Sequence, residues 1–107
     1  MAKIRLTYKS KEYTLEYTRK TVEMMENAGF NLDDVTTKPM TAIPMLFRGA
    51  FLAHHRNIEQ SLVDEIFGQI PDVKGLLREL NNMYAEPINA LLDDSEGTEK
   101  NATWTLS

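Results

Sequence analysis

The most apolar stretch of the chain covers residues 40–53, in which Arg48 is the only charged residue. Read as a helix, it has few polar positions on any side, and such a helix must be covered by other elements or cross a membrane. It is too short to cross, because a membrane span needs ~20 apolar residues. We therefore predict a central core helix over residues 42–54, with Phe47 and Phe51 in the interior and the other elements packed around it.

Two short runs near the N-terminus alternate apolar and polar residues with a period of two, which is typical of half-buried strands. Both lie within residues 3–17, and a short polar segment separates them. The pattern therefore predicts a β-hairpin, with its turn near residues 10–11 and Lys9 facing Glu12 across it. Because an isolated hairpin is only marginally stable in water, its apolar face should pack on helices.

Apolar residues at helical spacing predict three further helices. The first covers residues 19–28, because Thr18 is a suitable N-cap and Gly29 can take the left-handed conformation that ends a helix. The next two cover residues 58–69 and 73–92, and a proline separates them.

Three residues interrupt these helical patterns. With Thr41 as the cap of the central helix, Pro44 falls in the first turn, where its missing amide hydrogen costs little. Gly49 lies inside that helix and makes sense if another helix crosses closely there, since it costs ~1 kcal/mol relative to alanine. Pro87 lies inside the last helix and should kink it or start a new helix after Glu86.

The composition changes after residue 92. Residues 93–107 form an acidic, polar linker and a tail, and the tail alternates in a way that predicts a short strand over residues 102–106. The tail either returns as a third strand on the hairpin or stays a free peptide for a partner. We favour the ordered return, because Trp104 is the only tryptophan and needs a burial site.

The predicted fold is therefore α+β and mostly helical, with an N-terminal hairpin packed on a bundle of about four helices. The chain has 107 residues, and residues 1–92 are expected to form a single globular domain. The net charge is −4 and no basic cluster stands out, which argues against a nucleic-acid partner. The first residues lack the apolar run of a secretion signal, so we expect a cytoplasmic protein without a membrane partner.

No pattern of catalytic residues is present, so we expect a protein that is not an enzyme and binds no cofactor. The chain has no cysteine, which excludes disulfides and thiolate chemistry. His54 and His55 are adjacent, but no third histidine or cysteine could complete a metal site, so no metal is expected. With Arg56 they are interpreted instead as cations favoured at the end of the central helix.

Six methionines lie mostly on or beside apolar helix faces. Filling gaps in the core is the favoured interpretation, although methionine also suits adaptable binding surfaces. The regular stripe of the last helix allows a homo-oligomer, but burial within one chain explains the same pattern. The candidate residues for binding another protein are Met40, Met45, Met83, Pro87 and Trp104.

Several segments in a fixed order resemble one protein family. They are residues 11–19 (KEYTLEYTR), 25–30 (MENAGF), 38–41 (KPMT), 46–52 (LFRGAFL) with His55 and Arg56, and 102–105 (ATWT). Together they resemble small proteins encoded in tailed phages and prophages of Gram-positive bacteria, which look like tail assembly chaperones.

The resemblance implies a role in assembly rather than in chemistry. It implies that the protein binds the long, aggregation-prone tape measure protein in the host cytoplasm and assists assembly of the tail tube, with the tail tube protein as a further partner. It also implies that this chain is the short form of a pair produced by a frameshift, although no binding residue can be carried over. The alternative is a structural tail or head-completion protein that stays in the virion.

Overall fold

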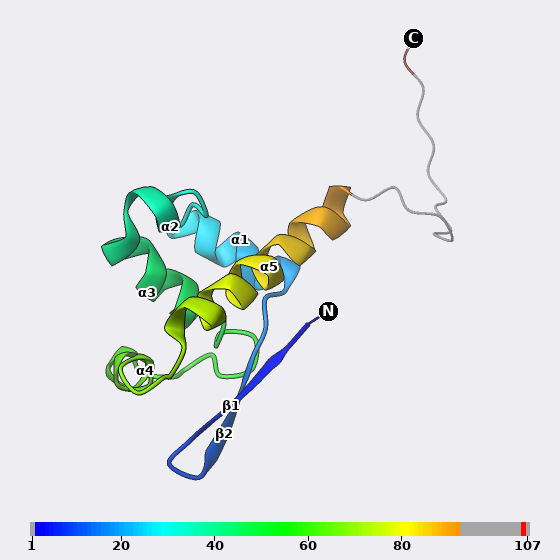
Figure 1. Ribbon diagram of the computed structural model, residues 1–107. Coiled ribbons are helices and arrows are strands. Elements are labelled where there is room, and N and C mark those ends of the chain that lie inside the picture. Colours follow the sequence, from blue (N-terminus) through cyan, green and yellow to red (C-terminus); the bar gives the residue numbers. More distant parts are fainter. Residues whose placement is uncertain (1, 93–105, 107) are drawn as a thin grey trace.

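The computed structural model describes residues 2–92 and 106. An antiparallel hairpin precedes the helices, and the longest helix runs past the hairpin and the shorter helices (Figure 1). This confirms the predicted α+β, mostly helical fold, whereas residues 102–105 of the predicted C-terminal strand lie outside the described part. The elements are β1 (Ile4–Tyr8), β2 (Lys11–Leu15), α1 (Arg19–Asn27), α2 (Asp34–Thr37), α3 (Pro39–Gly49), α4 (Gln60–Phe67) and α5 (Val73–Leu92).

The hairpin turns one residue earlier than predicted. Lys9 and Ser10 form a two-residue turn with φ angles of 50° and 67°, the left-handed pattern of a type I′ turn. The strands pair so that Tyr8 faces Lys11, and the expectation that Lys9 faces Glu12 was therefore wrong. Instead, the ammonium of Lys9 lies 3.2 Å from a carboxylate oxygen of Glu65 in α4, which ties the turn to the helices.

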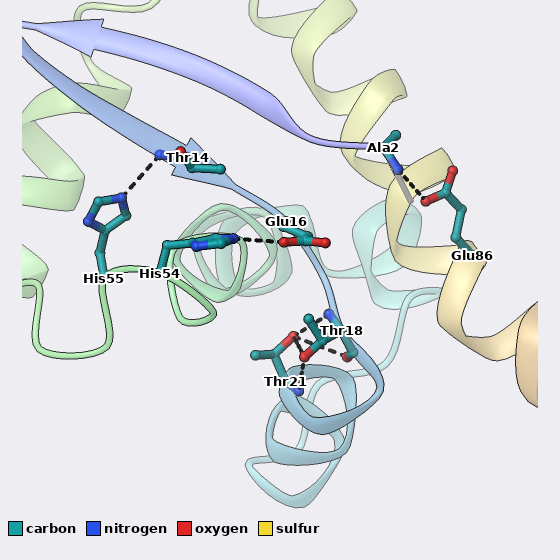
Figure 2. A network of polar contacts seen from close by, with 8 residues as sticks. All are labelled: Ala2, Thr14, Glu16, Thr18, Thr21, His54, His55 and Glu86. Atoms are coloured by element: carbon teal, nitrogen blue, oxygen red, sulfur yellow. Dashed lines mark hydrogen bonds and ion pairs between the residues drawn. The ribbon is translucent and has the colours of Figure 1, made fainter.

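The outer edge of β2 is covered by the segment that follows α3 (Figure 2). The amide of Thr14 donates to Nε2 of His55 at 3.0 Å. The amide of Glu16 donates to the carbonyl of Ala50 at 2.9 Å. His54 adds a contact of 2.7 Å between its Nε2 and the carboxylate of Glu16. Because α3 ends at Gly49, both histidines lie beyond its last turn, and the prediction that they act as helix-terminal cations was wrong.

The centre of the core is built from α3 and the turn that follows it. Phe47 is 1% exposed and Phe51 is fully buried, as the sequence predicted. The two rings pack edge to face with their centroids 5.1 Å apart. Tyr13 of β2 packs on Phe51, and Phe67 of α4 packs on Phe47, so the hairpin and α4 both contact this pair.

The boundaries of the central helix differ from the predicted 42–54. The helix begins at Pro39, a favoured first position because proline needs no amide partner there, so Thr41 is not its cap and Pro44 lies in its interior. It ends at Gly49, and Phe51 lies in the following turn.

Helix α1 is capped as predicted at both ends. The hydroxyl of Thr18 accepts from the amide of Thr21, and the hydroxyl of Thr21 accepts from the amide of Thr18, which forms a capping box (Figure 2). Gly29 has a φ of 97°, and the next amide, that of Phe30, donates to the carbonyl of Met25 at 2.9 Å. This Schellman arrangement turns the buried Phe30 back onto the core.

Helix α4 is shorter than the predicted 58–69, since it begins at Gln60, after Glu59 whose side chain forms no capping hydrogen bond, and ends at Phe67. Helix α5 matches the predicted 73–92, and the carboxylate of Asp72 accepts from the amide of Gly75 at 3.2 Å at its start. The helix runs through Pro87 to Leu92, so no new helix begins after Glu86. Among residues 2–92, no helix is long and apolar enough to span a bilayer.

Candidate protein-binding groove

A mostly apolar groove with a volume of about 500 Å³ lies between α1 and the C-terminal half of α3. We name it the methionine groove, because three of the six methionines of the chain line it. Its lining residues are Met24, Met25, Ala28, Pro44, Met45, Arg48, Gly49, Leu52 and Gln60.

The close crossing of α1 and α3 forms the floor of this groove. A Cβ atom on Gly49 would overlap the end of the Met25 side chain, so the glycine lets that side chain pack directly against the backbone of α3. The prediction of a close helix crossing at Gly49 is therefore confirmed. Met24 and Ala28 lie on one face of the α1 end, four residues apart, and extend the wall beside the buried Met25.

The walls combine apolar and adaptable side chains. Met24 and Met45 are half-buried, so each presents part of its thioether side chain to the groove. Methionine has three rotatable bonds and a polarizable sulfur, which lets it fit apolar partners of different shapes. Such a lining can hold an apolar segment of another chain, and it offers no nucleophile or general base.

Arg48 places a positive charge at the groove. Its Nη1 donates to the side chain of Gln60 at 3.1 Å, and its Nη2 donates to the carbonyl of Ile58 at 3.3 Å. Its Nε is buried without a hydrogen-bond partner, and no carboxylate pairs with this guanidinium among the described residues. The groove therefore adds one cationic group to an apolar surface, which suits a segment that carries an acidic residue.

The structure does not bring the predicted binding residues together. Met45 lines the methionine groove, whereas Met40 is 90% exposed near the start of α3 and does not line it. Met83 is 3% exposed and belongs to the core, so it presents no surface to a partner. Pro87 is buried along α5, and Trp104 lies outside the described residues.

Pro87 lines a second groove of about 490 Å³ between α1 and α5. The other apolar residues that line this second groove are Val22, Ile88 and Leu91. Charged side chains of both signs also line it, namely Arg19, Lys20, Glu23 and Glu26. This mixed border makes it a less selective surface for an apolar segment than the methionine groove.

Sequence reasoning did not identify Met24, Leu52 and Arg48 as parts of a binding surface. Met24 directly precedes the buried Met25 and lies beside the apolar face of α1. This position was the only indication in the sequence that Met24 could line a groove. Arg48 was noted only as the single charge of the apolar stretch. Its place at the groove depends on contacts with Gln60 and Ile58, which lie in a later segment.

The titratable groups of the fold serve structural contacts. Burial raises the pKa of Tyr17 well above its usual value, and the hydroxyl donates to the carbonyl of Leu46 at 2.5 Å. Burial lowers the pKa of His55, and its Nε2 accepts the amide hydrogen of Thr14. Within residues 2–92 and 106, no group of three potential ligands could hold a metal ion.

Comparison with known proteins identifies the family of this chain. Neither a curated protein nor a solved structure is significantly similar to it. One family matches over the whole sequence, residues 1–107, and its description is a domain of unknown function, DUF5055. The chain therefore belongs to the DUF5055 family.

Proposed function

We propose that this protein is a non-catalytic tail assembly chaperone of a phage or prophage, which binds the tape measure protein in the host cytoplasm. The observation that supports this most is the methionine groove, an adaptable apolar surface on an otherwise acidic protein with a net charge of −4. The second support is the sequence resemblance described above, which runs along most of the chain.

The groove suits transient binding of an aggregation-prone client. Met24 and Met45 can repack around different apolar side chains, so successive segments of a long protein fit the same surface. Arg48 favours segments in which an acidic residue lies next to the apolar ones. The negative charge of the remaining surface keeps the complex soluble while the apolar segment is covered.

The experiment is co-expression of the chain with the tape measure protein encoded in the same phage genome. We expect the tape measure protein to shift from the insoluble to the soluble fraction and to co-purify with this chain. A tape measure protein that stays insoluble and does not co-purify would contradict the proposal. The tail tube protein, expressed in the same way, tests whether it is a further partner.

Mass spectrometry of purified virions separates the chaperone from a structural tail or head-completion protein. A chaperone leaves after the tube is built, so we expect the chain in infected-cell lysates but not in purified particles. Stoichiometric amounts in virions would instead favour the structural role.

A further inference from the structure

The C-terminal end of α5 carries apolar side chains that the described part of the chain leaves in solvent. In Figure 1 the last turn of α5 projects away from the other helices. Leu91 is 55% exposed and Leu92 is 77% exposed, and both share a helix face with the half-buried Ile88, three and four residues earlier. Contiguous apolar side chains on the surface of a soluble domain mark an interaction site.

The second groove, between α1 and α5, lies beside this projecting end. Ile88 and Leu91 line it, and its floor is formed by Val22 of α1 and Pro87 of α5, which are both buried. The same surface therefore offers an apolar projection and an apolar hollow next to each other. Such a surface can pack against a copy of itself, because each projection then has a hollow to enter.

The charges that border the second groove change sign along α1. Arg19 and Lys20 lie in the first turn, Glu23 and Glu26 lie further along, and all four side chains are exposed. Lys20 and Glu23 form an ion pair of 3.3 Å within the helix, which contributes little because both groups are solvated. Arg19 and Glu26 are seven residues apart, which is ~10 Å of helix and too far for a pair within one chain.

We propose that two copies of the chain associate about a two-fold axis through this surface. The Leu91 and Leu92 end of each α5 then packs on the second groove of the other copy. A two-fold axis reverses the direction of α1, so Arg19 of one copy faces Glu26 of the other, and each such contact forms twice. A uniformly acidic or basic partner would instead meet two like charges on this border, so the charge pattern suits a second copy better.

The self-association itself is the first measurement. The second groove is small for a permanent interface, so we expect native chain to pass from monomer to dimer between ~1 μM and ~1 mM in sedimentation equilibrium. No larger species should form, because an isologous contact is complete with two copies. A native chain that stays monomeric over this range, or that forms larger oligomers, would overturn the proposal.

A charge in the apolar part of the surface should weaken the dimer. We expect Leu91→Asp to raise the dimer dissociation constant at least about tenfold. Met40→Asp is the matched control, since Met40 is 90% exposed and does not line the second groove, and it should dimerise like the native chain. Unchanged thermal unfolding of the monomeric Leu91→Asp protein separates loss of the dimer from misfolding. An equal loss of dimer in Met40→Asp, or none in Leu91→Asp, would contradict the placement.

Charge reversal tests the two-fold arrangement at exposed sites that do not threaten the fold. Arg19→Glu and Glu26→Arg should each weaken the dimer severalfold, because like charges then face each other twice. An equimolar mixture of the two variants should dimerise like the native chain, since the introduced glutamate of one copy then faces the introduced arginine of the other.

The direction of the two single effects separates this pairing from a general effect of net charge. Net charge alone would make Arg19→Glu dimerise more weakly and Glu26→Arg more tightly, because the native chain is already acidic. Single variants that dimerise like the native chain, or a mixture no tighter than either variant alone, would overturn the proposed arrangement. None of these outcomes depends on client binding, because the second groove and the methionine groove share no lining residue.

Discussion

Gly49 of α3 lies so close to Met25 of α1 that a Cβ atom there would overlap the Sδ of the methionine. The overlapping atoms belong to the end of a flexible side chain, so an alanine can be accommodated if Met25 moves. We expect Gly49→Ala to change the unfolding free energy by no more than about 1 kcal/mol, because better helix propensity offsets the displacement. Gly49→Val should cost about 1–3 kcal/mol, measured by urea unfolding.

A double-mutant cycle isolates this contact. With Met25→Ala in the background, the loss caused by Gly49→Val should shrink, because the overlapping atoms are absent. Additive losses would show that the two residues do not constrain each other.

The hydroxyl of Tyr17 replaces a helical hydrogen bond at the end of α3. The amide of Ala50 donates to Phe47 instead of Leu46, and the buried hydroxyl of Tyr17 donates to the Leu46 carbonyl. Tyr17→Phe should therefore cost about 1–3 kcal/mol of unfolding free energy, because a buried carbonyl loses its partner. Tyr13→Phe is the matched control, since no described residue forms a hydrogen bond with the Tyr13 hydroxyl, and an equal loss there would contradict this account.

Protonation of His55 should destabilise the fold. Burial lowers its pKa, and the neighbouring charges of His54 and Lys11 lower it further. Its Nε2 must also stay unprotonated to accept from Thr14. Because the folded-state pKa lies below the unfolded value of ~6.5, the unfolded chain binds more protons in that window. Stability is therefore fully present above pH ~6.5 and falls as the pH drops toward the folded-state pKa.

The measurement is urea unfolding at several pH values for the native chain and His55→Gln. We expect the variant to lose part of the decrease between neutral and mildly acidic pH. Identical pH profiles for the two proteins would show that His55 does not contribute.

The aromatic pair at the centre of the core should dominate stability. Phe51→Ala or Phe47→Ala should each cost about 3–5 kcal/mol, which is a large share of the ~5–15 kcal/mol typical of a domain. Phe67→Ala removes a half-buried ring and should cost less. Thermal unfolding of the three variants gives the order, and a smaller loss for Phe51→Ala than for Phe67→Ala would contradict it.

The helices that were predicted well begin or end at capping residues that can be recognised from a few neighbouring positions in the sequence. Thr18 and Gly29 mark both ends of α1, and Asp72 marks the start of α5. The end of α3 was missed because the apolar pattern continues through Phe51, whereas the helix ends at Gly49. Its last carbonyls are bonded by Tyr17 and by a tightened turn, and neither contact is visible in the local pattern.

The methionine groove could not be predicted from periodicity, because it exists only where α1 crosses α3. Periodicity shows which residues share a helix face, but it does not show which face stays uncovered. Met45 and Met83 both stood on apolar faces in the sequence, and packing left the first half-exposed and buried the second.

The most direct test of the central claim is the affinity of groove variants for the tape measure protein. Met45→Asp and Met24→Asp place a charge in the groove, whereas Met40→Asp makes the same change at a site 90% exposed and outside it. We predict that each groove variant binds at least about tenfold more weakly by titration calorimetry, while Met40→Asp binds like the native chain. Unchanged binding by both groove variants, or an equal loss in Met40→Asp, would contradict the account.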